Sequence, residues 1–174
     1  MNLPSRLHHT AAVTKDLEAT RRFYEEVIGL PLVATWCEQE DLFGKERTYC
    51  HVFFGLADGG ALAFFQFADA ADQAEFGPEM PRTPFNHLAF KADAETQARI
   101  RERALASGMR EPEYFELDHG YCHSIYLTDP NGIIVEFTRD PANADSIAAS
   151  KRATAHADLK RWLAGDHTPN NTLR

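Results

Sequence analysis

Three residues far apart in the chain, His9, His87 and Glu136, have side chains that bind divalent cations, and each lies in an apolar run typical of a β-strand. Glu136 stands within Ile133–Phe137, where an unpaired buried carboxylate would be costly. A salt bridge or an exposed sheet edge would account for Glu136 alone, whereas one bound cation accounts for all three side chains. Two imidazoles and a carboxylate suit Fe(II) best, with Mn(II) or Zn(II) as alternatives. We therefore predict a metal site on these three residues, with His8 as a rival to His9.

The elements that must position these ligands occur in the order β–α–β–β–β, twice. In the first unit a helix is expected from the N-cap Asp16 to Gly29, and the turn Asp58–Gly60 predicts a hairpin. The expected strands of this unit are Leu7–Val13, Pro31–Trp36, Tyr49–Leu56 and Ala61–Phe67. The second unit has a helix from Asp93 to Ser107 and strands at Asn86–Lys91, Glu113–Leu117, His123–Thr128 and Ile133–Thr138.

The repeat predicts an α+β fold of paired βαβββ modules, whose curved mixed sheets enclose a pocket. We expect one domain over residues 1–140, with modules at about 6–67 and 85–139 and a linker at 68–84. Residues 141–174 would add a helix at Asp145–Ala164, docked on the body or on a partner subunit, and a loose tail. Shifting the second unit back by 72 positions lays Glu136 on Phe64 and His123 on His51.

Composition narrows the class of protein. The chain has 174 residues and a net charge of −8 without a basic stripe, so we expect no binding to nucleic acid or anionic membranes. Its apolar runs are too short to span a bilayer, and the N-terminus lacks the apolar run of a signal peptide. The three cysteines have no CxxC spacing, which is typical of reduced thiols in the cytoplasm.

Several motifs resemble the vicinal oxygen chelate superfamily. The segment from His8 to Leu30 is similar to the opening of these proteins, and Phe85–Phe90 and Asp129–Phe137 are similar to their second-module motifs. The resemblance covers Leu7 to about Thr138. It implies that the histidine before the Asp-Leu pair, the second-module histidine and the final glutamate bind a divalent metal, which favours His9 over His8. Because the superfamily includes glyoxalases, dioxygenases, epimerases, thiol transferases and metal-free binders, membership does not define the reaction.

The number of ligands helps to separate these activities. Sites of the glyoxalase I type carry a fourth ligand, a glutamate in the last strand of the first module. At that point the 72-residue shift places Phe64, and the next residue expected on the same face is Gln66. Neither is a carboxylate, so we expect three protein ligands and room for a bidentate catecholate and dioxygen.

The stretch from His119 to Glu136 resembles the extradiol dioxygenase motif, in which His, Tyr, an acid, Pro, Gly and Glu follow at set spacings. One departure is Leu117, where the motif prefers another residue. The resemblance implies that His119 acts as the acid and base and that Tyr126 donates a hydrogen bond to a substrate oxygen. A turn histidine and a core tyrosine are the structural alternatives. His123 should lie on the opposite strand face from Tyr126.

These inferences predict a cytoplasmic Fe(II)-dependent extradiol dioxygenase that acts on a catechol-like aromatic and O₂. Phe53, Phe65 and Phe90 are available to line its pocket, and the C-terminal helix makes a homodimer plausible. One alternative is a glyoxalase-like lyase or an epimerase of the same superfamily. Another is a binding protein without catalysis. The presence of His9, His87 and Glu136 argues against it, because metal-free binders of the superfamily usually lack these ligands.

Overall fold

The computed structural model describes residues 4–77, 83 and 85–173, and it confirms the α+β fold of paired βαβββ modules. Two four-stranded sheets have the orders β1-β4-β3-β2 and β5-β8-β7-β6, and we call them sheet A and sheet B. Sheet A consists of β1 (His9–Val13), β2 (Leu32–Leu42), β3 (Lys45–Gly55) and β4 (Ala61–Phe67). Sheet B consists of β5 (His87–Lys91), β6 (Tyr114–Asp118), β7 (His123–Thr128) and β8 (Ile134–Arg139).

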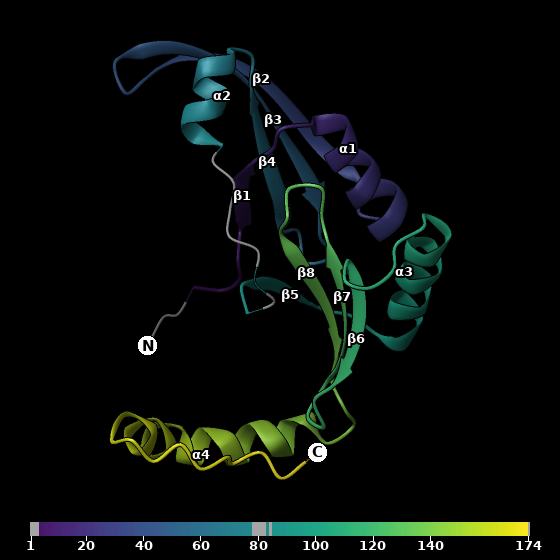
Figure 1. Cartoon of the computed structure of the whole chain (residues 1–174), viewed down its shortest axis with the longest axis vertical. Coiled ribbons are helices and arrows are strands. Elements are labelled where there is room, and N and C mark those ends of the chain that lie inside the picture. Colours follow the sequence, from purple (N-terminus) through teal and green to yellow (C-terminus); the bar gives the residue numbers. More distant parts are fainter. Residues whose placement is uncertain (1–3, 78–82, 84, 174) are drawn as a thin grey trace.

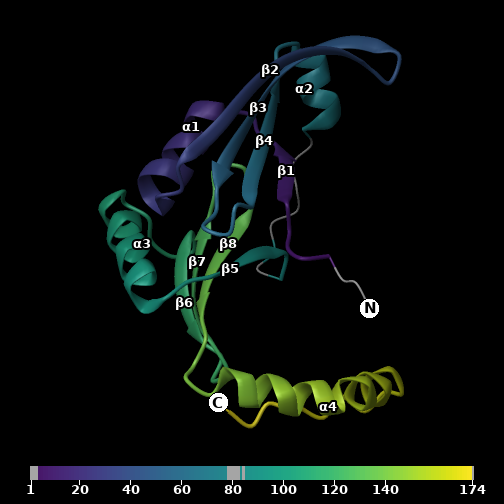
Figure 2. The ribbon, with the colours of Figure 1, turned by 180° about the vertical axis from the view of Figure 1, so that it is seen from behind.

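The two sheets form a crescent, with the module helices on its convex side (Figures 1 and 2). The first helix begins as α1 (Leu17–Arg21), continues as the π-helix η1 (Arg22–Ile28) and ends at Gly29, whose φ is 91°. In the second module α3 (Ala94–Ala106) has the equivalent place. Asp16 and Asp93 cap these helices through their carboxylates, as predicted.

One hydrophobic core lies between the sheets and these helices and contains residues of both modules. Tyr24, completely buried, donates a hydrogen bond to Asp129 at 3.0 Å and so connects η1 to the turn before β8. Arg103 of α3 donates to the carbonyl oxygen of Val27 at 2.7 Å. The two modules therefore share one core and buried polar contacts.

The pairing register corrects the predicted alignment of the modules. His9 pairs with Ala61 in sheet A as His87 pairs with Ile134 in sheet B, so β4 and β8 correspond through a shift of 73 positions rather than 72. A slip of one residue turns a strand's side chains to the other face. Glu136 therefore corresponds to Ala63, whereas Phe64 faces the core beside Tyr24.

Three predicted boundaries were wrong. β2 and β3 extend to eleven residues each because the polar segment after Trp36 continues the hairpin to a turn at Phe43 and Gly44. The predicted linker at 68–84 contains α2 (Ala70–Phe76), capped by the carboxylate of Asp69; residues 78–82 and 84 lie outside the described part of the chain. Asp72 of α2 is buried and lies 3.2 Å from Arg47 of β3. This ion pair fixes α2 to sheet A.

The C-terminal helix is present as α4 (Ala144–Leu163), but none of its residues is buried. It leaves one end of the crescent instead of docking on the body (Figure 1). The tail that follows is not loose, since it turns back along α4 and Lys151 donates to the carbonyl oxygen of Asn170 at 2.8 Å. No described helix is both long enough and apolar enough to cross a membrane.

Candidate functional site

His87 and Glu136 meet on the concave face of sheet B. The Nε2 atom of His87 lies 2.9 Å from Oε2 of Glu136, and the hydroxyl of Ser124 donates to Oε1. β8 alternates so that Val135 and Phe137 enter the core while Glu136 faces the other way, and yet Glu136 is only 5% exposed. The strand thus holds a buried carboxylate with polar partners on both oxygens.

His119 and Tyr126 form a second pair beside the first. The Nε2 atom of His119 lies 2.9 Å from the Tyr126 hydroxyl, and the ring of Phe115 stacks on Tyr126 with 4.6 Å between centroids. The rings of Tyr126 and His87 are nearly perpendicular, with 5.9 Å between their centroids. Burial, the main cause, raises the pKa of Tyr126 to about 12, so its hydroxyl remains protonated near neutral pH.

His9 lies on sheet A, at the position that corresponds to His87. Its ring contacts are with His8, whose Nδ1 is 2.8 Å from Nδ1 of His9, and with Phe53 and His51. Among the described residues, a group of metal-binding donor atoms within 4.8 Å of one another comprises His119, Cys122 and Glu136 and does not include His9. The structure thus brings together His87, Glu136, His119 and Tyr126, and leaves His9 apart.

The other two strand histidines have different surroundings. His123 faces the helices, where Nε2 is 3.7 Å from Glu116, which agrees with the predicted opposite face from Tyr126. His51 faces the concave side, stacked on Phe65 at 3.6 Å, so its expected equivalence to His123 was wrong. Burial, and then the charge of His9, lowers the pKa of His51.

A cavity of about 700 Å³ opens beside the His119–Tyr126 pair. Its apolar lining includes Phe85, Phe115 and Leu117. Its polar lining consists of His87, His119 and Tyr126 together with Thr83, Glu111, Glu113 and Thr128. A second cavity, of about 840 Å³, lies between the edge strands β1 and β5.

The aromatic residues expected in the pocket lie elsewhere. Phe53 and Phe65 surround His51 on sheet A, and Phe90 packs against Phe137 in the core. Sequence reasoning missed Phe115, Ser124 and Cys122. Alternation in β7, which places Ser124 on the same face as Tyr126, could have identified Ser124.

The chain thus combines two βαβββ modules with a histidine–carboxylate pair on the concave face of sheet B. Residues 6–137 match the Glyoxalase/Bleomycin resistance protein/Dioxygenase superfamily, and the chain belongs to it. α4 and the tail lie outside the matched residues.

Two kinds of named relatives are similar to this chain. A probable lactoylglutathione lyase of Vibrio parahaemolyticus is 26% identical over 78% of this chain and 91% of its own length. The crystal structure of the lactoylglutathione lyase from Agrobacterium tumefaciens is 25% identical over 79% of this chain and 96% of its own, with a TM-score of 0.51. A structure of a mutant of the fosfomycin resistance protein FosX from Listeria monocytogenes, with Mn(II) and dihydroxypropylphosphonic acid, is 23% identical over 78% of this chain and 92% of its own, with a TM-score of 0.54.

Proposed function

We propose that the protein is a divalent-metal-dependent enzyme that catalyses extradiol cleavage of a catechol-like aromatic by O₂. The observation that carries this proposal is the hydrogen bond between His119 and Tyr126, 2.9 Å long, at an apolar cavity that His87 also lines. An acid–base group and a hydroxyl donor thus lie beside a carboxylate–imidazole pair, in a cavity suited to an aromatic ring.

The residues present fit a metal. A carboxylate that is 5% exposed, 2.9 Å from an imidazole nitrogen, offers one oxygen and one nitrogen donor on the same face. We propose Fe(II) as the metal and His87 and Glu136 as two of its ligands. We propose His9 as the third ligand, and its side chain would have to move toward this pair when the metal binds. When bound, such an ion supplies positive charge that favours ionisation of the substrate hydroxyls, together with open positions for oxygen donors.

The other side chains have separate tasks. His119 accepts a proton from a substrate hydroxyl through Nε2, the atom that now faces Tyr126. Tyr126 remains protonated and donates a hydrogen bond to the substrate oxygen as negative charge develops there. Phe115, stacked on Tyr126, and Leu117 provide the apolar wall for the substrate ring and reduce access of water.

A glyoxalase-like lyase is the second candidate, because the two lactoylglutathione lyases are among the similar proteins. Against it stands Ala63, which occupies the first-module position equivalent to Glu136. A methyl group cannot provide the fourth ligand of a site of the glyoxalase I type. The predicted alignment placed Phe64 at this position and the corrected register places Ala63 there. Neither side chain can bind a metal, so both alignments support three protein ligands.

One experiment separates the two reactions. The protein is loaded anaerobically with Fe(II) and given a panel of catechols and then O₂, while O₂ uptake and visible absorbance are followed. We expect O₂ uptake with at least one catechol. Turnover of a thiol adduct of a ketoaldehyde under nitrogen, without O₂ uptake on any diol, would establish the lyase instead.

Substitutions test the assigned roles. His119→Ala should retain the metal and lose about 100-fold or more in turnover, since a general acid–base group contributes that much. His9→Ala should weaken Fe(II) binding, whereas His8→Ala, its matched neighbour, should not. Equal metal affinity in both variants removes His9 from the ligand set, and unchanged turnover in His119→Ala removes the proton-transfer role.

A further inference from the structure

Cys122 lies next to two of the residues just discussed. One nitrogen of His119, the sulfur of Cys122 and one oxygen of Glu136 all lie within 4.8 Å of one another. His119 and Cys122 come from the turn between β6 and β7, and Glu136 comes from β8. Imidazole, thiol and carboxylate are the three side-chain groups that bind Zn²⁺ in proteins.

The turn that connects β6 to β7 produces this arrangement. The backbone N–H of His119 donates to the carbonyl oxygen of Cys122 at 2.9 Å, which closes a tight turn. Gly120 has a φ of 78°, and Asp118 accepts a hydrogen bond from its N–H at 2.8 Å. The turn therefore brings two residues three positions apart onto the same side of sheet B.

Ser124 connects the thiol to the carboxylate. Its hydroxyl lies 3.8 Å from the Cys122 sulfur and donates to Oε1 of Glu136. His119 and Cys122 are partly exposed while Glu136 is buried. A cation from solution would thus meet the imidazole and the thiol first and the carboxylate behind them.

The distances suit a small tetrahedral ion after a modest adjustment. Donor atoms around tetrahedral Zn²⁺ are about 3.3 to 3.6 Å apart, from metal–ligand distances of about 2.0 to 2.3 Å. The observed limit of 4.8 Å is about one ångström wider, which rotation of two partly exposed side chains can close. Coordination would convert the Cys122 thiol to a thiolate and release its proton to solvent.

We propose that His119, Cys122 and Glu136 form a thiolate-containing binding site for Zn²⁺, with the fourth position open to water. This inference goes beyond the proposed function and does not depend on it. Binding there would take His119 from Tyr126 and draw Glu136 from His87, so the zinc site and the proposed Fe(II) site exclude each other. A thiolate also favours Zn²⁺ over Mn(II), because soft ligands select softer ions.

The probe is Co²⁺, which takes the same tetrahedral geometry and has a visible spectrum. We expect the apoprotein, reduced and titrated anaerobically, to develop a near-ultraviolet thiolate-to-cobalt charge-transfer band and intense visible ligand-field bands. One equivalent of Zn²⁺ should abolish both, and binding of each Zn²⁺ should release about one proton from the thiol. The absence of a charge-transfer band in the wild-type protein overturns the proposal.

Cys122→Ser and Cys37→Ser form a matched pair, because the sulfurs of Cys37 and Cys50 lie 3.7 Å apart and offer a rival thiol site. Cys122→Ser should lose the charge-transfer band and bind Zn²⁺ at least about 100-fold more weakly, while Cys37→Ser should keep both. The reverse pattern places the metal on sheet A and overturns the proposal. Both variants are compared by their metal spectra. The test of the zinc site therefore gives a result even if the protein cleaves no catechol.

Discussion

At the scale of single residues, the site depends on how Glu136 is shared. Its two oxygens have different partners, Ser124 on Oε1 and His87 on Oε2. His119 and Cys122 approach the same carboxylate from the β6–β7 turn. In the two metal sites that we propose, the metal would decide which imidazole accompanies the carboxylate and whether His119 remains available for proton transfer.

Tyr126 is not one of the proposed metal ligands, so its substitution tests the catalytic step separately from metal binding. Tyr126→Phe should lower kcat about 100-fold, because it removes a hydrogen-bond donor to a developing oxyanion. Since burial raises the pKa of Tyr126 to about 12, its hydroxyl stays protonated and cannot be the group that titrates in a neutral pH–rate profile. The profile of Tyr126→Phe should therefore keep the wild-type shape at a lower level.

Tyr114→Phe is the matched control for this test. Tyr114 is also a buried tyrosine of sheet B, and its pKa too is raised to about 12, chiefly by burial. Its hydroxyl, however, lies near Arg101 and Glu116 on the helix side of the sheet. Turnover should be unchanged in Tyr114→Phe; an equal loss in both variants would point to a structural effect.

Residue types predicted part of the site and missed the rest for a physical reason. His87 and Glu136 could be paired because a histidine or a carboxylate within an apolar strand is costly to bury without a polar partner. Cys122 had no such signal, since a single cysteine without a metal-type spacing is usually structural. Its relation to Glu136 depends on a turn geometry and on a neighbouring strand, neither of which sequence spacing fixes.

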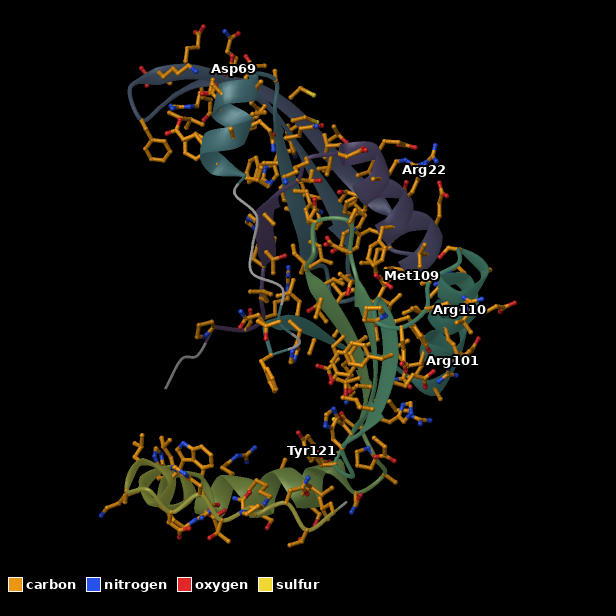
Figure 3. All side chains as sticks on the ribbon, in the orientation of Figure 1. Arg22, Asp69, Arg101, Met109, Arg110 and Tyr121 are labelled. Carbon is orange, nitrogen blue, oxygen red and sulfur yellow. The ribbon has the colours of Figure 1, made fainter. Side chains whose placement is uncertain are left out.

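At the scale of elements, the tail and the β6–β7 turn are connected. Asn171 donates to the carbonyl oxygen of His119 at 3.2 Å. Leu173 lies against Gly120, where an added Cβ atom would overlap the Leu173 carbonyl oxygen. Figure 3 shows the neighbouring Tyr121 at the end of sheet B next to α4. The tail thus packs on the turn that carries His119.

Gly120→Ala should release the tail, and Gly108→Ala is its matched control. Both glycines have positive φ, 78° and 92°, so an alanine costs about 1 kcal/mol of backbone strain at either position. Only at Gly120 does the added methyl group meet the tail, because no atom lies within 4 Å of it at Gly108. Limited proteolysis should remove the C-terminal residues faster in Gly120→Ala alone; equal rates in both variants would contradict the contact.

The sequence predicted the order of the elements better than their register. Alternating and helical patterns, with Asp16 and Asp93 as caps, were sufficient for the two modules. The shift between β4 and β8 was wrong by one position because similar apolar residues flank Glu136 and Phe64 on both sides. The correspondence between β4 and β8 follows from their pairing with β1 and β5. An alignment of the two strand sequences alone does not include that pairing.

At the scale of the whole molecule, α4 has the tail alongside it but remains largely exposed. None of its residues is buried, and Leu159, Trp162 and Leu163 are each more than half exposed. The helix projects from one end of the crescent, as both ribbon views show (Figures 1 and 2). A twenty-residue helix with exposed large apolar side chains is typical of a subunit contact.

We predict that two copies associate through α4. Sedimentation or light scattering should show a dimer, and Leu159→Ser with Leu163→Ser should raise its Kd at least about 100-fold, because each buried leucine contributes about 1.5–3 kcal/mol and a two-fold interface uses it twice. Leu105→Ser on α3 is the control, since Leu105 is also exposed but lies at the end of a helix that packs on the shared core. A monomeric wild-type protein, or the same effect from Leu105→Ser, would contradict the assignment of α4 to this contact.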